Sequence, residues 1–74
     1  MSKADKMLFE QGFKKTEIKE SWQEEARARY EEDFGGSITF GYKSTTLHIK
    51  SISYINIDLW LALNEKMKEL GWIE

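Results

Sequence analysis

The chain begins with an amphipathic pattern of helical period. Ser2 is suited to cap a helix, and Asp5 stands three residues later, where a capping box usually has Glu. Residues of one face recur every three or four positions: Ala4, Met7, Leu8 and Gln11. We predict a helix over residues 3–11, with Gly12 ending it in the left-handed conformation and Phe13 folding back onto it.

The last part of the chain has the same design. Either Asn56 or Asp58 can cap a second helix. Its apolar residues form one stripe: Leu59, Trp60, Leu63, Met67 and Leu70. The pattern stops at Gly71 and Trp72, so that MKELGW resembles LFEQGF near the start. We interpret both stretches as helix ends closed by Gly, with no internal repeat.

Alternating patterns between the two helices predict strands. Residues 37–42 and 46–51 each place apolar side chains on one face: Ile38, Phe40 and Tyr42 in the first, and Leu47 and Ile49 in the second. A two-stranded hairpin is marginal in water, which favours a third strand. We place its end near Glu31, followed by a turn at residues 33–36.

The segment before that turn is ambiguous. Apolar residues spaced by four permit a helix: Ile18, Trp22, Ala26, Tyr30 and Phe34. The alternation of Ala28 and Tyr30 with Arg27 and Arg29 equally suits a strand. We predict an α+β fold over residues 1–74 as a single small domain. It has an N-terminal helix, a three-stranded antiparallel sheet and a C-terminal helix packed on the sheet. The alternative makes residues 17–32 helical and gives an α-α-β-β-α order.

Composition narrows the class of protein. A chain of 74 residues with 41% hydrophobic and 32% charged residues is typical of a small soluble domain. It contains no Cys, lacks a signal-peptide pattern at its start, and its most apolar window, residues 52–63, is too short to span a bilayer. We therefore expect a cytoplasmic protein without membrane contact. The net charge of −2 predicts no general affinity for nucleic-acid phosphates, and residues 17–33 concentrate seven acids against three bases.

Candidate chemistry is sparse. His48 is the single histidine, and on a strand it should point away from Leu47 and Ile49, with no Ser, His and Asp set around it. Adjacent acids such as Glu24 and Glu25 point to opposite faces of a strand and do not converge on one ion. We therefore expect no enzyme activity, no cofactor and no metal.

Exposed apolar and acidic side chains point instead to protein binding. Phe9 and Leu61 fall off the apolar stripes of their helices, and Trp22 lies in the most acidic part of the chain. With Glu24 and Glu31 they form the candidate partner-binding set. Two alternatives stay open: a homodimer joined at an edge strand or at the Leu61 side, and nucleic-acid binding by the sheet face. The residues considered for the latter are Tyr42, Lys43, His48, Lys50 and Tyr54.

Two blocks of sequence also resemble a known group. The blocks are KADKM leading to GFKK at residues 3–15, and LNEKMKELGW at residues 63–72. They are similar to small uncharacterised proteins encoded by phages and prophages of Gram-positive bacteria. The run LWLAL at residues 59–63 departs from the group's usual pattern. The resemblance implies an accessory protein of the bacterial cytoplasm that binds and modulates a host or defence protein.

Overall fold

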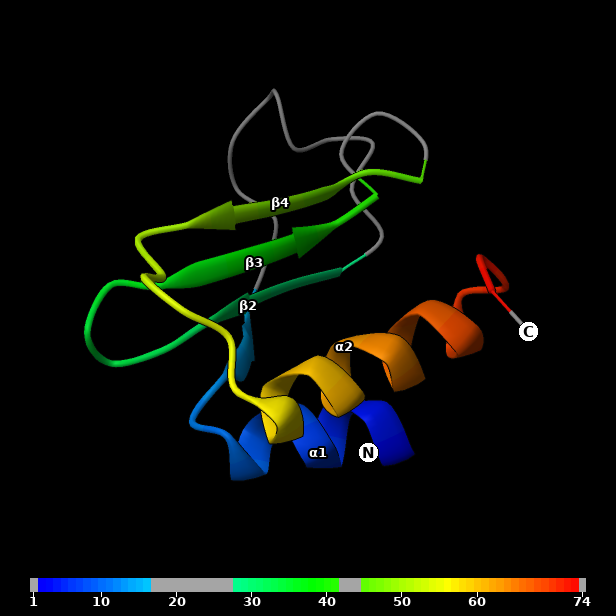
Figure 1. Cartoon of the computed structure of the whole chain (residues 1–74), viewed down its shortest axis with the longest axis horizontal. Helices are drawn as coiled ribbons and strands as arrows, with labels where there is room; N and C mark the ends of the chain where they lie inside the picture. Colours follow the sequence, from blue (N-terminus) through cyan, green and yellow to red (C-terminus); the bar gives the residue numbers. More distant parts are fainter. Residues whose placement is uncertain (1, 17–27, 42–44, 74) are drawn as a thin grey trace.

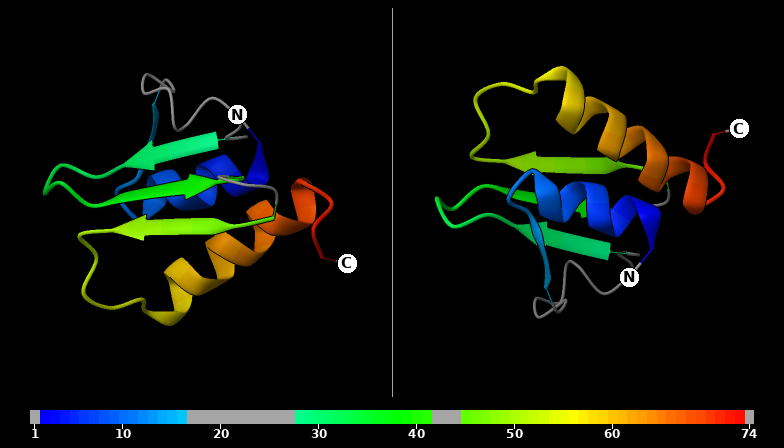
Figure 2. Two further views of the ribbon diagram at one scale, coloured as in Figure 1. Left: turned by 90° about the horizontal axis from the view of Figure 1, so that it is seen from above. Right: turned by 90° about the horizontal axis from the view of Figure 1, so that it is seen from below.

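A computed structural model describes residues 2–16, 28–41 and 45–73 (Figure 1). The elements follow in the order α1 (Lys3–Glu10), β1 (Lys14–Thr16), β2 (Ala28–Glu31), β3 (Ser37–Phe40), β4 (Leu47–Lys50) and α2 (Ile57–Glu69). The strands form one antiparallel sheet in the order β1-β2-β3-β4. Both helices lie on the same face of this sheet, α1 beneath its middle and α2 beside it toward β4 (Figure 2). The predicted α+β class is confirmed.

Both helices end in the way that the sequence predicts. At the end of α1, the Phe13 N–H donates to the Leu8 carbonyl at 2.9 Å and Gly12 has φ of 91°. At the end of α2, the Trp72 N–H donates to the Met67 carbonyl at 2.9 Å and Gly71 has φ of 80°. Each pattern is a Schellman motif, in which a left-handed residue lets the next amide satisfy an orphan carbonyl.

The helix starts are also capped by the predicted residues. The Ser2 hydroxyl accepts a hydrogen bond from the Asp5 N–H at 3.1 Å, and Asn56 accepts one from the Leu59 N–H at 2.8 Å. Asn56 rather than Asp58 is therefore the cap of α2. The capping box at α1 is incomplete, because the Asp5 carboxylate instead bonds to residues of the sheet and α2.

The described residues form a sheet of four strands, and the prediction of three is wrong. The missed strand is β1, where Lys14, Lys15 and Thr16 pair with Glu31, Tyr30 and Arg29. Its residues show no alternation of apolar and polar side chains, so the pattern carried no strand signal. Residues 28–31 are β2, which confirms the predicted third strand there and excludes the helical alternative for them. The rest of that alternative, residues 17–27, lies outside the described residues.

The core fills the space between the helices and one face of the sheet. It consists of Leu8, Phe13, Ala28, Tyr30, Ile38, Phe40, Leu59, Ala62 and Leu63. The Tyr30 and Phe40 rings pack edge to face, with their centroids 5.8 Å apart. The ring centroids of Phe40 and Trp72 are 6.1 Å apart. The prediction that Trp60 belongs to the buried stripe of α2 is wrong, since it is 49% exposed. Ala62 and Lys66 occupy that face instead.

A polar cluster explains why a lysine is buried in α2. The Lys66 Nζ lies 3.2 Å from Asp5 Oδ1 and 3.1 Å from Glu69 Oε2. The Tyr30 hydroxyl donates a hydrogen bond to the same Asp5 oxygen, and the Lys15 Nζ lies 3.8 Å from the other. The cluster thus joins α1, α2, β1 and β2 through one carboxylate.

Neither described helix is long and apolar enough to cross a membrane.

Ionisation in the cluster follows from these contacts. Burial opposes the charged form of Asp5, but the hydrogen bonds from Tyr30 and Lys66 and the charges of Lys66 and Lys15 outweigh it, so the pKa of Asp5 is lowered. Burial, and next the hydrogen bond to Asp5, raises the pKa of Tyr30 far above its ordinary value. The folded state therefore holds an ionised Asp5 beside a neutral Tyr30.

Candidate protein-binding surface

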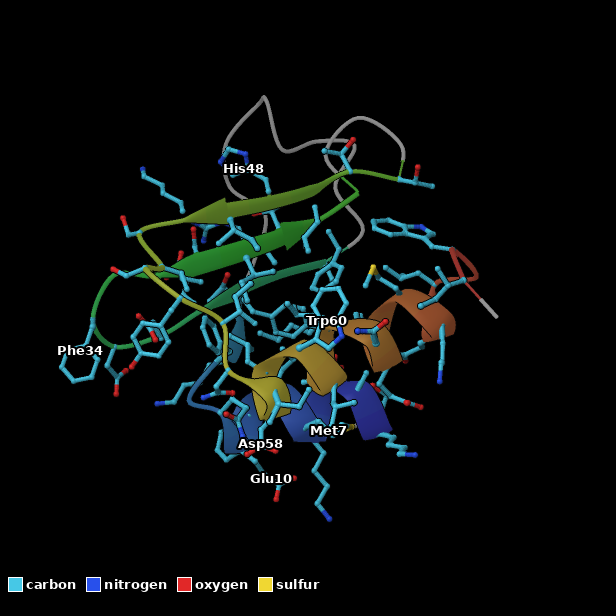
Figure 3. The ribbon with its side chains drawn as sticks, in the orientation of Figure 1. Met7, Glu10, Phe34, His48, Asp58 and Trp60 are labelled. Carbon is cyan, nitrogen blue, oxygen red and sulfur yellow. The ribbon has the colours of Figure 1, made fainter. Side chains whose placement is uncertain are left out.

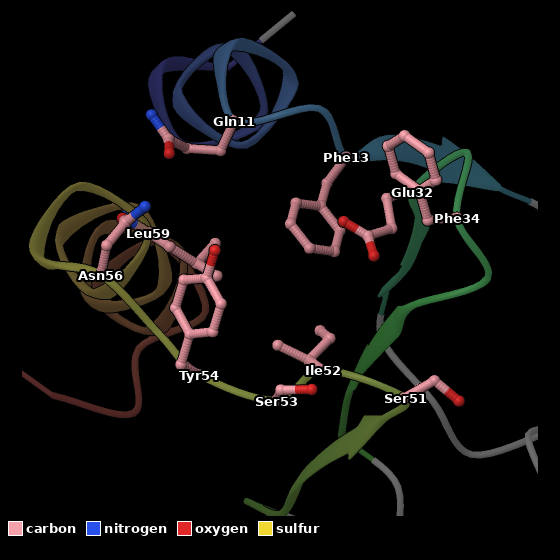
Figure 4. A pocket seen from close by; sticks show the side chains of 10 residues that line it. All are labelled: Gln11, Phe13, Glu32, Phe34, Ser51, Ile52, Ser53, Tyr54, Asn56 and Leu59. Atoms are coloured by element: carbon pink, nitrogen blue, oxygen red, sulfur yellow. The ribbon is translucent and has the colours of Figure 1, made fainter.

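A hollow opens at one end of the molecule, between the β2–β3 turn, the end of α1 and the segment that joins β4 to α2 (Figure 4). Its volume is about 350 Å³, at the lower end of the range of ligand sites. Ten residues line it: Gln11, Phe13, Glu32, Phe34, Ser51, Ile52, Ser53, Tyr54, Asn56 and Leu59. We call this hollow the end pocket.

The β2–β3 turn places an aromatic residue at the rim of the end pocket. The Glu32 N–H donates to the Gly36 carbonyl at 2.9 Å, and the Gly35 N–H donates to the Glu32 carbonyl at 3.3 Å. Gly35 has φ of 93°, as expected for a three-residue hairpin loop that ends in a left-handed residue. Phe34 therefore stands at the tip of a tight turn and is 93% exposed. Its side chain extends away from the sheet (Figure 3).

The same turn sets the position of Glu32. A Cβ added at Gly36 would lie 2.5 Å from the Glu32 Oε1, so glycine leaves room for this side chain. The Glu32 carboxylate extends toward the middle of the pocket beside the Phe13 ring (Figure 4). No described residue forms a hydrogen bond or ion pair with it. A partly buried carboxylate without a partner is a group that a ligand can satisfy.

The opposite wall comes from the segment that follows β4. Ser51 turns this segment away from the sheet with φ of 59°, which is uncommon for a residue other than Gly. Ile52 packs against the core, and Tyr54 stands across the pocket from Glu32 (Figure 4). Tyr54 is 78% exposed. Two aromatic side chains, from the turn and from this segment, therefore border one pocket that contains a free carboxylate.

A second hollow adjoins the first. It has a volume of about 170 Å³ and lies between α1 and α2, lined by Met7, Glu10, Gln11, Asp58 and Leu61. Gln11 lines both hollows, so they are neighbours at the end of α1. Figure 3 shows Met7, Glu10 and Asp58 on the helix side of the molecule. We call the two hollows together the acidic groove, because Glu10, Glu32 and Asp58 line it and no Lys or Arg does.

The predicted partner-binding residues are placed on separate surfaces. Leu61 lines the acidic groove. Phe9 is exposed on α1, two residues from Met7, and helical geometry turns it to the flank away from the groove. Glu31 belongs to β2 and pairs with Arg29 on the sheet face opposite the helices. Trp22 and Glu24 lie outside the described residues.

The predicted partner-binding set did not include Phe34, Tyr54 or Glu32, and Tyr54 was named only for nucleic-acid binding by the sheet face. The sequence placed Phe34 in the predicted turn at residues 33–36, with the helical series spaced by four as the alternative, and the structure confirms the turn. A large apolar residue next to Gly-Gly in a predicted turn was the available signal, since turn residues are exposed. Tyr54 and Glu32 had no such signal, because only the fold brings them to one pocket.

Among the residues that the structure describes, the other candidate groups form no catalytic arrangement. His48 is partly buried on β4, and its register opposite Thr39 places it on the face away from the helices, as predicted (Figure 3). Within residues 2–16, 28–41 and 45–73, no group of three His, Asp or Glu side chains is placed to hold a metal ion.

No protein-family model, curated protein or solved structure significantly matches the chain. The acidic groove is therefore the strongest candidate site of the described surface.

Proposed function

We propose that this chain is a non-enzymatic module that binds a partner protein through the acidic groove. The observation that carries the proposal is the pair Phe34 and Tyr54, which are 93% and 78% exposed and border the same pocket. Exposed aromatics next to a pocket are typical of interface hot spots, because binding a partner removes their apolar surface from water. The turn that holds Phe34 is short and hydrogen-bonded, so little ordering entropy opposes binding.

The biological setting in this proposal comes from the sequence. The blocks at residues 3–15 and 63–72 resemble phage and prophage proteins of Gram-positive bacteria. We therefore place the module in the bacterial cytoplasm as an accessory protein that modulates a host or defence protein. Leu61, predicted from the sequence, extends the contact surface from the end pocket along α2.

The alternative of nucleic-acid binding by the sheet gains no support. Strand alternation puts Arg29, Ser37 and Thr39 on the face opposite the helices. Ser37 and Thr39 are buried, so the middle of this face is not an open surface for bases. Arg29 is paired with Glu31. The described part of the sheet therefore shows no platform of exposed aromatics among basic residues. Tyr42 and Lys43, which were predicted for this surface, lie outside the described residues.

Affinity capture with matched variants tests the proposal. The immobilised chain is incubated with a Gram-positive lysate, bound proteins are identified, and the strongest candidate is purified and titrated back onto the labelled chain. We expect Phe34→Ala and Leu61→Ala each to weaken binding by about tenfold or more, as hot-spot truncations do. Trp60→Ala is the matched control, because Trp60 is half-exposed but lines neither hollow. The proposed function would be refuted if Trp60→Ala weakened binding of the partner as much as Phe34→Ala does. It would also be refuted if Phe34→Ala weakened the binding of no captured protein.

A further inference from the structure

The chemistry of the end pocket identifies the kind of partner that it fits. Its walls combine aromatic and apolar side chains with the uncharged polar side chains of Gln11, Ser51, Ser53 and Asn56. Glu32 is the single acidic residue of the lining, and no basic residue lines it. A carboxylate without a partner attracts a cation, and aromatic faces attract cations through their ring quadrupoles. Both features disfavour an anionic ligand. The pocket is therefore matched to a positively charged group attached to an apolar stem.

Arginine meets these requirements best among the protein side chains. Its guanidinium is planar, stacks on aromatic faces and donates two parallel hydrogen bonds to one carboxylate. Its three methylene groups can pack on apolar walls such as Phe13, Ile52 and Leu59. Phe34 and Tyr54, on opposite elements at the rim, are available to stack on the guanidinium or to cover its stem.

The second hollow extends the same charge pattern. Glu10 and Asp58 line it together with the apolar side chains of Met7 and Leu61. A partner segment that enters the end pocket with one basic residue would meet two further acids and an apolar strip as it continues past Gln11. Charge complementarity along the whole groove thus favours a segment that carries several basic residues and at least one apolar residue.

We propose that the acidic groove binds a basic segment of a partner protein, with one arginine side chain inserted in the end pocket against Glu32. This inference rests on the proposed function, because it specifies the partner surface that the module contacts. It concerns the described residues of the groove alone, and it can be tested without knowledge of the partner.

The test uses a minimal probe and its neutral analogue. The isotope-labelled chain is titrated with N-acetyl-arginine N-methylamide, and backbone amide shifts are followed by NMR. N-acetyl-citrulline N-methylamide, which has nearly the same shape without the charge, is the comparison. We expect saturable shifts at Phe34, Ser53 and Tyr54 with the arginine probe and binding at least about tenfold weaker with the citrulline probe. Equal binding of the two probes, or shifts confined to other surfaces, would overturn the inference.

Two variants that each remove one negative charge distinguish a specific contact with Glu32 from general charge attraction. Glu32→Gln should weaken the arginine probe by about tenfold or more, as expected when a charge-assisted hydrogen bond is lost. Asp33→Asn removes one charge from the next residue, which is exposed and does not line the pocket, and should change binding less than about twofold. Equal effects of the two substitutions would mean general charge attraction and would overturn the pocket assignment.

Failure of this inference is distinguishable from failure of the proposed function. A captured partner that needs Phe34 but is unaffected by Glu32→Gln would keep the binding module and remove the arginine. Specific arginine binding in the pocket, without any partner sensitive to Phe34→Ala, would support the pocket assignment and count against the proposed function alone.

Discussion

Gly12 and Gly71 hold backbone conformations that other residues adopt only at a cost, with φ of 91° and 80°. Apart from the adjoining residues of the chain, no atom lies within 4 Å of a Cβ built at either position, so a substitution meets no side-chain clash. The cost of replacing them is therefore backbone strain alone. Both positions give a clean measure of what a left-handed helix cap contributes to the stability of this fold.

We expect Gly12→Val and Gly71→Val each to lower the free energy of unfolding by about 1 kcal/mol or more. A β-branched residue is strongly disfavoured in the left-handed region, whereas Asn tolerates it better. Gly12→Asn and Gly71→Asn are therefore the controls and should cost less than the valines. Urea unfolding followed by tryptophan fluorescence measures all four. Losses near zero for both valines would contradict the cap assignment.

Tyr30 gives a prediction for alkaline pH. Its pKa is raised above the ordinary value of 10.0 in the folded state, so the folded state keeps a proton that the unfolded state loses. The stabilisation is fully present below pH 10 and declines as pH rises beyond it, at a slope approaching about 1.4 kcal/mol per pH unit. Tyr30→Phe should remove this contribution to the slope, although it lowers stability at neutral pH.

Tyr54→Phe is the matched control, because Tyr54 is exposed and forms no part of the cluster. Urea midpoints measured from neutral pH to about pH 11 compare the three proteins. The wild type and Tyr54→Phe should lose stability in parallel, while Tyr30→Phe loses less over the same interval. A slope for Tyr30→Phe equal to that of the wild type would show that Tyr30 does not stay neutral in the folded state.

At the scale of elements, the polar cluster fixes how the helices sit on the sheet. Asp5 from α1 bonds to Tyr30 on β2 and Lys66 on α2, and Lys15 on β1 lies beside it, so four elements share one carboxylate. Lys66 is 5% exposed and also contacts Glu69 and the face of the Tyr30 ring. Removing the lysine would leave two acids close to an apolar core without their counter-charge.

We expect Lys66→Met to lower the free energy of unfolding by about 2 kcal/mol. A fully buried pair that loses one partner costs about 3–5 kcal/mol. The smaller value applies because the Asp5 and Glu69 side chains are 14% and 39% exposed. Lys68→Met is the control, since Lys68 is an exposed residue of the same helix. Equal urea midpoints for the two variants would show that the cluster does not stabilise the fold.

The elements show what the sequence pattern could and could not predict. Both helices, their glycine ends and the strands β3 and β4 followed from period and turn residues. The period was ambiguous for β2, which was predicted as a strand because a two-stranded hairpin is marginal. The strand β1 was not predicted, because Lys14 and Lys15 are exposed edge residues whose pairing with β2 is tertiary. Lys66 was unpredictable for a similar reason. Its burial depends on Asp5, 61 residues earlier in the chain.

At the scale of the whole molecule, the groove was less predictable than the fold. Leu61 was identified from its position outside the apolar stripe, and it lines the groove. Glu32, Phe34 and Tyr54 gather at one pocket because the β2–β3 turn and the segment after β4 emerge at the same end of the molecule. A sequence pattern predicts which side of one helix or strand is buried. This site instead depends on three separate parts of the chain: the β2–β3 turn, the end of α1 and the segment after β4.

The charge of the groove bears on whether two copies join there. A twofold symmetric dimer presents the same patch on both partners, so it would bring Glu10, Glu32 and Asp58 close to their own copies. Like charges across an interface cost free energy, and no Lys or Arg lines the groove to offset them. The exposed Phe34 and Tyr54 alone would favour self-association, but the acids that line the groove oppose it.

We therefore expect the groove to stay free of self-association at neutral pH and low salt. In sedimentation velocity at micromolar concentration, the wild type should show no dimer that depends on Phe34. Phe34→Ala should therefore sediment as the wild type does. Glu32→Gln with Asp58→Asn should increase self-association, because the apolar surface stays while the repulsion falls. Raising the salt should have the same effect in the wild type, since about 0.15 M salt screens charges beyond about 8 Å. A wild-type dimer at low salt that Phe34→Ala disrupts would show that the groove binds a second copy rather than a basic partner.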